Sequence, residues 1–356
     1  MPSTTSQIII VTGANGYLAL HVINQLLRRA TTCVAQSDLG WQTTSFKPHF
    51  ATITGGRLTT AFVEDLANPE LFREAFDENT VGAIHVASPT HARTEDAVRD
   101  MLNPAVKGAI GILEAAKIYA SPSFRRVVHL SSTAAITDSK KGPRPGYTYT
   151  NSDWNPVTFE EAAAIEDHVS LYVASKALSE KAVWAWMTEH KPKFDLACVN
   201  PTMVFGPHLE SISNMDEFTS TAKFLWRLVD AAEIPQLMWA GCVDVRDTAA
   251  MTVAAFEKHE AGGQRLFANQ QSMTRATIPH VPGPPGRAFA SKVVIVASGM
   301  FNTLELLKLS FIGPAEELAA FDTPLAKHHP GVGTNMHDNY EGVLYGTFGL
   351  TNNAFK

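Results

Sequence analysis

Short β-branched runs alternate with amphipathic stretches along the N-terminal part of the chain. A buried strand is a run of about four to eight apolar residues, whereas a helix repeats apolar residues at every third or fourth position. The pattern predicts strands at residues 7–13, 31–38, 57–66, 81–89, 125–133 and 194–207. It predicts helices at residues 16–30, 68–78, 96–120, 171–190, 216–232 and 247–260.

Strands that alternate with helices imply parallel β-α-β units and an α/β fold with a doubly wound parallel sheet, a Rossmann fold. We expect residues 1–206 to form a dinucleotide-binding Rossmann domain, completed by segments around 239–270. Beyond residue 207 the periodicity weakens. Residues 207–238 and 271–356 are predicted to form a smaller C-terminal substrate-binding lobe.

The first predicted strand runs into a glycine turn and then a helix, in "IIIVTGANGYLALHV" at residues 8–22. Gly13 permits a sharp turn, and Gly16 lets the backbone approach a pyrophosphate at the helix N-terminus, where N–H groups and the helix dipole attract anions. The alternative is a plain structural turn. The position near the chain start, after a strand and before a helix, favours a dinucleotide site that includes Asn15, Tyr17 and Leu18.

Asp38 stands 22 residues after Gly16, at the end of the second predicted strand. An acidic residue about 20 residues further on normally binds the adenosine ribose 2′-OH and would repel the 2′-phosphate of NADP. The alternative is that Asp38 only starts a turn with Gly40. In that case Lys47 or Arg57 could bind the phosphate.

A tyrosine and a lysine lie one helical turn apart in "LYVASK" at residues 171–176. Taken alone, Tyr172 and Lys176 could be a surface pair. Within a doubly wound sheet, however, their helix follows the strand that ends in "HLSST", and ligands bind at the carboxyl ends of such strands. The ammonium and a positive nicotinamide ring would lower the tyrosine pKa from its usual value of about 10, as a proton donor near neutrality requires. A serine hydroxyl at the strand end could hold the carbonyl oxygen.

Eight segments occur in order between residues 11 and 250: "VTGANGYLALHV", "VEDL", "HVASP", "NPAVKG", "VVHLSST", "YVASK", "NPTMVFGP" and "VDVRDTA". They resemble the extended short-chain dehydrogenase/reductase family, in particular its branch of dihydroflavonol 4-reductases and fungal aldehyde/ketone (methylglyoxal-type) reductases. The resemblance implies an NAD(P)-dependent oxidoreductase that reduces an aldehyde or ketone to an alcohol, or runs in reverse.

The resemblance also implies roles for individual residues. Ser132 would polarise the substrate carbonyl and Tyr172 would be the general acid, while Lys176 would bind the nicotinamide ribose and lower the tyrosine pKa. The cofactor would also contact Asp65, Leu66, Ala87, Pro201 and Val204. Structural alternatives exist, since Asp65 could cap a helix and Pro201 could simply end a strand. Thr90 and Thr133 would face the substrate.

Two positions depart from the family pattern. The branch usually ends its second strand with an arginine that binds the NADP phosphate, whereas this chain has Asp38, so NAD is a possible or preferred cofactor alongside NADP. Many relatives have phenylalanine where this chain has Thr90. The smaller side chain would widen the pocket, and we therefore expect a bulky hydrophobic or aromatic substrate.

Composition excludes several other classes of protein. A net charge of −6 with scattered basic residues indicates neither nucleic acid nor an anionic membrane surface as partner. Three cysteines, far apart and odd in number, argue against a disulfide framework and suggest a reducing compartment. No signal peptide, membrane span or metal-ligand spacing is recognisable. We expect a cytoplasmic monomer or homodimer with a small-molecule substrate and no metal.

Two other functions remain open at this level. Epimerases and dehydratases of nucleotide sugars share the Ser-Tyr-Lys set but tend to keep their cofactor bound through turnover. Some relatives are non-catalytic redox sensors, which generally lack the Tyr-x-x-x-Lys pair.

Overall fold

We analysed a computed structural model of the chain. The described residues are 7–29, 31–37, 56–89, 94–142, 144, 146–209, 220–226, 241–269, 271–272, 312–320, 325–330 and 332. Asp38, Lys47 and Thr90 lie outside them. Residues 1–284 and 285–356 form two compact units, which are described separately.

Seven parallel strands form the central sheet, in the order β3-β2-β1-β4-β5-β6-β9. Their bounds are β1 Ile8–Thr12, β2 Thr32–Ser37, β3 Leu58–Phe62, β4 Thr80–His85, β5 Arg126–Leu130, β6 Asp195–Pro201 and β9 Arg265–Ala268. The chain winds outward from β1 to β3 and then returns to β4 on the other side of β1. This reversal is the topological switch point at which such sheets bind ligands, beyond the carboxyl ends of the strands.

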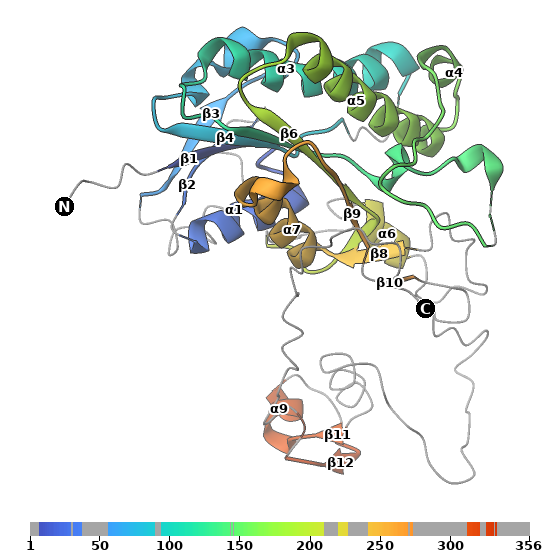
Figure 1. Cartoon of the computed structure of the whole chain (residues 1–356). Coiled ribbons are helices and arrows are strands. Elements are labelled where there is room, and N and C mark those ends of the chain that lie inside the picture. Colours follow the sequence, from blue (N-terminus) through green and yellow to red (C-terminus); the bar gives the residue numbers. More distant parts are fainter. Residues whose placement is uncertain are drawn as a thin grey trace. The chain divides into compact units, whose positions relative to one another are not determined.

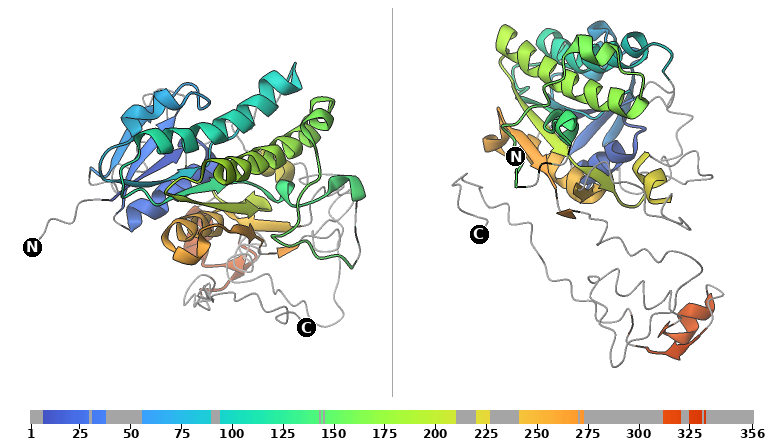
Figure 2. Two further views of the ribbon diagram at one scale, coloured as in Figure 1. Left: turned by 45° about the horizontal axis from the view of Figure 1, so that its top comes forward. Right: turned by 90° about the vertical axis from the view of Figure 1, so that its right-hand side faces the viewer.

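Helices cover both faces of this sheet (Figures 1 and 2). Among the described residues, the α-helices of the first unit are α1 Tyr17–Arg28, α3 Asn103–Tyr119, α4 Phe159–Ala163, α5 His168–His190, α6 Ser220–Trp226 and α7 Val245–Glu257. The short helical turns are η2 Pro69–Ala75, η3 Val98–Leu102, η4 Thr133–Ala135, η5 Ser139–Lys141 and η7 His259–Ala261. The parallel sheet between helical layers confirms the predicted Rossmann fold.

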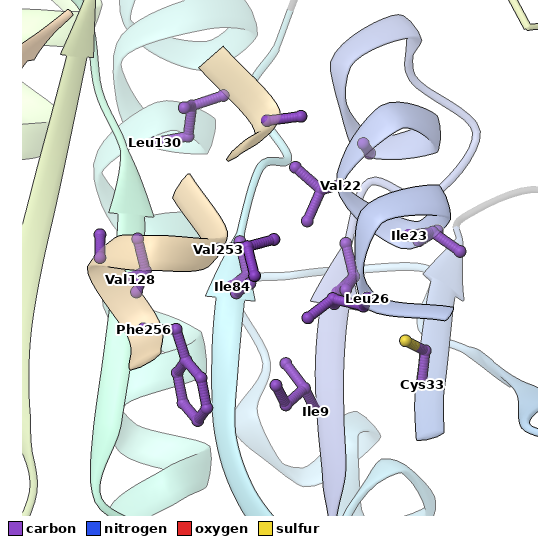
Figure 3. Close-up of a cluster of buried hydrophobic side chains, with 14 of the residues drawn as sticks. Ile9, Val22, Ile23, Leu26, Cys33, Ile84, Val128, Leu130, Val253 and Phe256 are labelled. Atoms are coloured by element: carbon purple, nitrogen blue, oxygen red, sulfur yellow. The ribbon is translucent and has the colours of Figure 1, made fainter. Parts of the chain in front are cut away.

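Two hydrophobic cores hold the layers together because alternate residues of each buried strand face opposite sides. On one face α1 and α7 pack on the sheet, where Leu26 and Phe256 meet strand residues such as Ile84 and Val128 (Figure 3). On the other face α3 and α5 cover Ile10 and neighbouring strand residues. The apolar stripe of α1 recurs with helical spacing, as the sequence pattern predicts.

The predicted strand at 194–207 is wrong in one respect, since the structure divides it in two. After β6 ends at Pro201, the chain leaves the large sheet and forms β7 (Met203–Phe205). This strand pairs in parallel with β8 (Gly241–Asp244), which pairs in antiparallel with β10 (Gln271–Ser272). Pro201 itself has no N–H to donate, and beyond it the Thr202 N–H still donates to the Ala268 carbonyl of β9, at 3.0 Å, before the chain leaves the central sheet.

Two predicted helices also differ from the structure. The segment at 68–78 forms the 3₁₀-helix η2, capped by the Asn68 side chain. The helix predicted at 96–120 begins with the π-helical turn η3 before α3 continues it. Pro104 cannot donate to the carbonyl four residues before it, so the preceding turn has room to widen.

The strand predicted at 57–66 is shorter than expected, because β3 ends at Phe62 and the irregular residues 63–65 lead into a turn at residues 66 and 67. By contrast, the pattern missed β9, which lies within the segment expected to complete the Rossmann domain. The predicted substrate-binding lobe falls largely outside the described residues, and the domain boundaries stay a prediction.

In the second unit the structure describes β11 (Ile312–Gly313), α9 (Ala315–Ala320) and β12 (Lys327–His328), with β11 and β12 paired in parallel. Among the described residues, no helix has the length and hydrophobicity needed to cross a membrane.

Two glycines of α3 make a sharp test of this packing. A Cβ added at Gly111 would lie 1.9 Å from the carbonyl oxygen of Leu66, whereas one added at Gly108 would lie 3.4 Å from the Leu66 Cβ. We expect Gly111→Ala to destabilise the protein by about 1–3 kcal/mol through overpacking. Gly108→Ala is the matched control and should be neutral or stabilising by up to about 1 kcal/mol, because alanine favours helix. Thermal or urea unfolding of both variants measures the difference, and equal effects would contradict the close approach of α3 to residue 66.

Candidate active site

The turn after β1 is built from a close approach between two backbones. Gly13 has a φ of +64°, and a Cβ at this position would lie 2.7 Å from the Ala87 Cα in the segment after β4. Any other residue would therefore be strained by its φ and would also collide with Ala87. The structure thus brings Gly13 and Ala87, both predicted cofactor contacts, side by side at the switch point of the sheet.

Two buried polar side chains hold this turn in place. The Gln36 carboxamide, at the end of β2, accepts a hydrogen bond from the Gly13 N–H at 3.0 Å and donates one to the Val63 carbonyl at 3.0 Å. The Thr12 hydroxyl accepts from the N–H groups of Val86 and Ala87 at 3.2 and 3.3 Å. The ends of β1, β2, β3 and β4 are therefore tied together. The sequence analysis missed both residues, because nothing local marks a buried glutamine or threonine as a brace.

The N-terminus of α1 suits an anion. Gly16 is its N-cap residue, no side chain caps it, and its first turn has no acidic residue. The first N–H groups of a helix have no acceptor four residues before them, but the Gly16 N–H donates to the Gly13 carbonyl at 2.8 Å. A pyrophosphate contact by the backbone of Asn15 to Leu18 stays a prediction. The Tyr17 side chain has a structural task, since its hydroxyl donates to the Gly206 carbonyl at 2.8 Å. A cofactor contact by Tyr17 therefore rests on its backbone.

Of the residues expected near the adenosine part of the cofactor, the structure describes Asp65 and Leu66 but not Asp38. The Asp65 carboxylate accepts a hydrogen bond from the Ala67 N–H at 2.9 Å, so it shapes a turn, and Asn68 rather than Asp65 caps η2. Leu66 packs against α3. Both residues follow β3 at the cofactor edge of the sheet, and their contacts with adenine stay predictions.

Arg57 is excluded as a ligand of an NADP phosphate. It precedes β3, and its carbonyl accepts from the Cys33 N–H near the start of β2. It therefore lies at the amino-terminal edge of the sheet, about 17 Å from the carboxyl ends of these strands at ~3.3 Å per residue. Lys47, the other basic candidate, lies outside the described residues, as does Asp38.

Ser132 follows β5 and begins the short helix η4. Its Oγ accepts a hydrogen bond from the Ala134 N–H at 3.1 Å, so the hydroxyl hydrogen is left to donate to a ligand. The side chain is half-buried at the carboxyl edge of the sheet, as predicted. Thr133 is buried within η4, and its carbonyl accepts from residues of the following turn. A substrate contact by Thr133 stays a prediction.

Tyr172 and Lys176 lie on the part of α5 that packs against η4. Lys176 is buried, and its Nζ donates to the Leu130 carbonyl at the end of β5 at 2.9 Å. Burial lowers the pKa of Lys176 to about 8, while Glu180 and Cys198 act in the opposite direction. The pair is therefore not a surface pair, and its helix is fastened to the strand that leads to Ser132.

Burial raises the pKa of the half-buried Tyr172 phenol. The lowering expected from Lys176 is not seen in the protein alone, where the ammonium is directed to a carbonyl. Tyr172 therefore keeps its proton at neutral pH, the state that a proton donor needs. A positive nicotinamide ring would stabilise phenolate, and a lowered pKa stays a prediction for the complex.

A pair of histidines next to Lys176 was not predicted. His85 and His129 are paired residues of β4 and β5, and their rings stack with centroids 5.4 Å apart. Burial and the Lys176 charge lower the pKa of His85 to about 3, and burial, His85 and Lys176 lower that of His129. Both rings are therefore neutral. Because Thr12 accepts two N–H bonds, its hydroxyl hydrogen goes to His85 Nδ1 at 2.8 Å.

The remaining predicted residues fall at or near the same edge. Pro201 ends β6 next to β9, and Val204 lies in β7, opposite Val243 of β8. Their contacts with nicotinamide stay predictions, and Thr90 lies outside the described residues. Among the described residues, no cluster of three or more histidines, cysteines or carboxylates is arranged to hold a metal ion.

Comparison with known proteins identifies the same architecture. The profile of the NAD dependent epimerase/dehydratase family matches residues 9–267. The chain is 32% identical to the NADPH-dependent methylglyoxal reductase GRE2 of Saccharomyces cerevisiae, over 75% of this chain and 79% of that protein. It is 31% identical to the ketoreductase azaE of Aspergillus niger, over 73% of this chain and 76% of that protein.

A solved structure agrees with these sequence relatives. The crystal structure of the yeast methylglyoxal/isovaleraldehyde reductase Gre2 with NADPH covers 74% of this chain and 78% of its own, with a TM-score of 0.68 and 32% identity. The predicted resemblance to extended reductases and the predicted class of NAD(P)-dependent oxidoreductase are confirmed.

The role of Gln36 can be tested by removing its carboxamide. Gln36→Leu leaves the Gly13 N–H without its acceptor, at a cost of about 1–3 kcal/mol, and frees the turn that faces the cofactor. We expect the Kd of the reduced nicotinamide cofactor to rise at least about tenfold in a fluorescence titration. Gln25→Leu, on the half-buried side of α1, is the matched control. Unchanged cofactor affinity in Gln36→Leu would contradict the bracing role.

Proposed function

The chain belongs to the NAD dependent epimerase/dehydratase family, and we propose that it reduces an aldehyde or ketone to an alcohol with Ser132, Tyr172 and Lys176. The observation that carries this proposal is the hydrogen bond from Lys176 Nζ to the Leu130 carbonyl. Leu130 lies two residues before Ser132. The bond therefore fixes the helix with the proton donor against the strand end with the carbonyl-binding hydroxyl.

Each of the three side chains has a distinct task in the reduction. NAD(P)H, when bound, would supply the hydride that reduces the carbonyl carbon. Ser132 donates its hydroxyl hydrogen to the carbonyl oxygen and stabilises the negative charge that develops there. Tyr172, which is protonated at neutral pH, delivers a proton to the same oxygen. Lys176 binds the nicotinamide ribose and stabilises the phenolate that is left.

The residues at the switch point fit a dinucleotide. Gly13 and Ala87 leave backbone rather than side chain at the turn, and the uncapped N-terminus of α1 faces the position of a pyrophosphate. These features serve either nicotinamide cofactor, since NAD and NADP differ only at the adenosine 2′-position. We propose that Asp38 makes NAD(H) the preferred cofactor, in contrast to the NADPH-dependent relatives.

The substrate proposed here is a bulky hydrophobic or aromatic carbonyl compound. Its support is Thr90 in "ASPT", where many relatives have phenylalanine, together with the reductase relatives. The yeast reductase is named for methylglyoxal and isovaleraldehyde, and the Aspergillus enzyme for a ketone. An aromatic α-oxoaldehyde such as phenylglyoxal combines the reactive group with a larger apolar body and is a suitable first probe.

Cofactor preference is tested by titrating the purified protein with NADH and NADPH in parallel and following nicotinamide fluorescence. We expect NADH to bind about tenfold more tightly, or ~1.4 kcal/mol, because a carboxylate repels the 2′-phosphate. Asp38→Asn should narrow the difference. Tighter binding of NADPH would mean that Asp38 is only a turn residue and that a basic side chain such as Lys47 holds the phosphate.

The catalytic assignment is tested with Tyr172→Phe. Loss of the phenolic proton should lower kcat for phenylglyoxal reduction by about 10²- to 10⁴-fold, while binding of the reduced cofactor persists. Tyr119→Phe is the control, since Tyr119 lies at the end of α3 against the apolar core. A Tyr172→Phe protein with wild-type kcat would refute the proposed function.

A further inference from the structure

Glu180 continues the row of functional residues on α5. It lies four residues after Lys176 and eight after Tyr172, so the three side chains fall on neighbouring parts of one helix face. Lys176 is 4% exposed, and Glu180 is completely buried. A buried carboxylate is costly unless donors surround it, so its contacts indicate its task.

Four donors reach the Glu180 carboxylate. The Ser131 hydroxyl and the Asn200 amide, at 2.6 Å, donate to Oε2. Arg265 Nε, at 2.6 Å, and Trp184 Nε1, at 3.4 Å, donate to Oε1. Both members of the ion pair with Arg265 are buried. Three of these donors come from three different strands, because Ser131 directly follows β5, Asn200 is the penultimate residue of β6 and Arg265 is the first residue of β9.

The same donors extend to the backbone around Ser132. The Asn200 amide also donates to the Ser132 carbonyl at 3.0 Å. The Arg265 guanidinium donates to the carbonyls of Asn151 and Asp153, at 2.8 and 2.5 Å, and to that of Ala135 in η4, at 3.3 Å. Arg265 also stacks on Trp154 at 3.6 Å. A displacement of Glu180 would therefore shift the backbone both before Ser132, at Ser131, and after it, at Ala135.

We propose that Glu180 is the positioning residue of this site, a role that rests on the proposed reductase function. Its carboxylate holds the segments that carry Ser132 and Pro201 against the helix that carries Tyr172 and Lys176. It also supplies the buried negative charge next to the Lys176 ammonium. Glu180 acts through these residues and touches neither the substrate nor the cofactor.

The surroundings of Lys176 show why this charge matters. Tyr172 and Glu180 come from α5, His85 from β4, His129 from β5 and Cys198 from β6. Both histidines are neutral, and burial raises the pKa of the Cys198 thiol well above its usual value. Of the two groups whose electrostatic effect raises the Lys176 pKa, Glu180 has the larger effect and Cys198 the smaller. Without it, burial would favour the neutral amine.

The test is Glu180→Gln in the full chain, with phenylglyoxal and saturating reduced cofactor. The amide keeps the size of the side chain but presents an NH₂ group to donors, so the network cannot be satisfied. We expect kcat to fall about 10- to 100-fold with KM changed less than about threefold. In the wild-type protein kcat should decline at alkaline pH as Lys176 loses its proton, at a pH below the usual range of a lysine because burial lowers the lysine pKa. In Glu180→Gln this decline should move to lower pH by about one unit or more, because the opposing charge is gone.

Glu257→Gln is the matched control. Glu257 ends α7, on the other face of the sheet from α5, and forms an exposed ion pair with Arg29. It should leave kcat and the pH profile unchanged. If Glu180→Gln does not fold, Ser131→Ala removes one link and leaves the charge. It should then lower kcat about 3- to 10-fold without moving the pH profile.

The possible failures are distinguishable. A folded Glu180→Gln protein whose kcat falls equally at every pH would show a merely structural role and overturn the inference. Wild-type values for kcat and pH profile would overturn it as well. In both cases a wild-type protein that reduces phenylglyoxal, and a Tyr172→Phe protein that does not, would leave the proposed function standing. An inactive wild-type protein, or an active Tyr172→Phe variant, would instead refute the proposed function.

Discussion

The candidate site depends on one buried ammonium group. Lys176 is almost inaccessible to water, and its charge is compensated by the Leu130 carbonyl and by the carboxylate of Glu180 on the next helical turn. A buried charge is tolerated only with such partners. The partners in turn belong to the end of β5 and to the network that reaches β6 and β9. The hydrophobic core packs α5 on the sheet, and these polar partners fasten the part of α5 that carries Tyr172 to the end of β5.

The turn after β1, the second part of the candidate site, depends on close backbone packing rather than on charge. Gly13 and Ala87 approach so closely that a side chain at residue 13 is excluded, and Gln36 and Thr12 hold the four strand ends around them. The turn thereby leads directly from the end of β1 into the N-terminus of α1, the end of a helix that favours anions. The turn after β1 lies at the switch point between β1 and β4, and α5 is fastened at the end of the neighbouring strand β5, so both elements of the proposed site lie at the carboxyl ends of adjacent strands.

Features encoded by residues close together in the sequence were predicted, whereas contacts between residues far apart in the sequence were not. The turn at Gly13, the strand end at Ser132 and the pair Tyr172–Lys176 are each encoded within a few residues, and the structure gathers their elements at one edge of the sheet. The Glu180–Arg265 ion pair joins residues 85 positions apart, and the contacts of Gln36 span more than 20 positions. No periodicity reveals such pairs. Arg57, an alternative phosphate ligand in the sequence analysis, precedes β3 and so lies at the opposite edge of the sheet from the carboxyl ends of the strands. The single strand predicted at 194–207 includes β7 but not the division after Pro201, where the chain moves from one sheet to another.

The most direct test of the account follows the hydride itself. Purified protein is mixed with phenylglyoxal and nicotinamide cofactor that carries deuterium at C4, in separate reactions for each face of the ring, and the product is analysed by mass spectrometry. The account predicts that one of the two preparations transfers its deuterium to the new carbinol carbon, with one cofactor oxidised per alcohol formed. Cofactor that is never consumed, or alcohol without label from either preparation, would contradict the assignment of the Ser132, Tyr172 and Lys176 site as a carbonyl reductase.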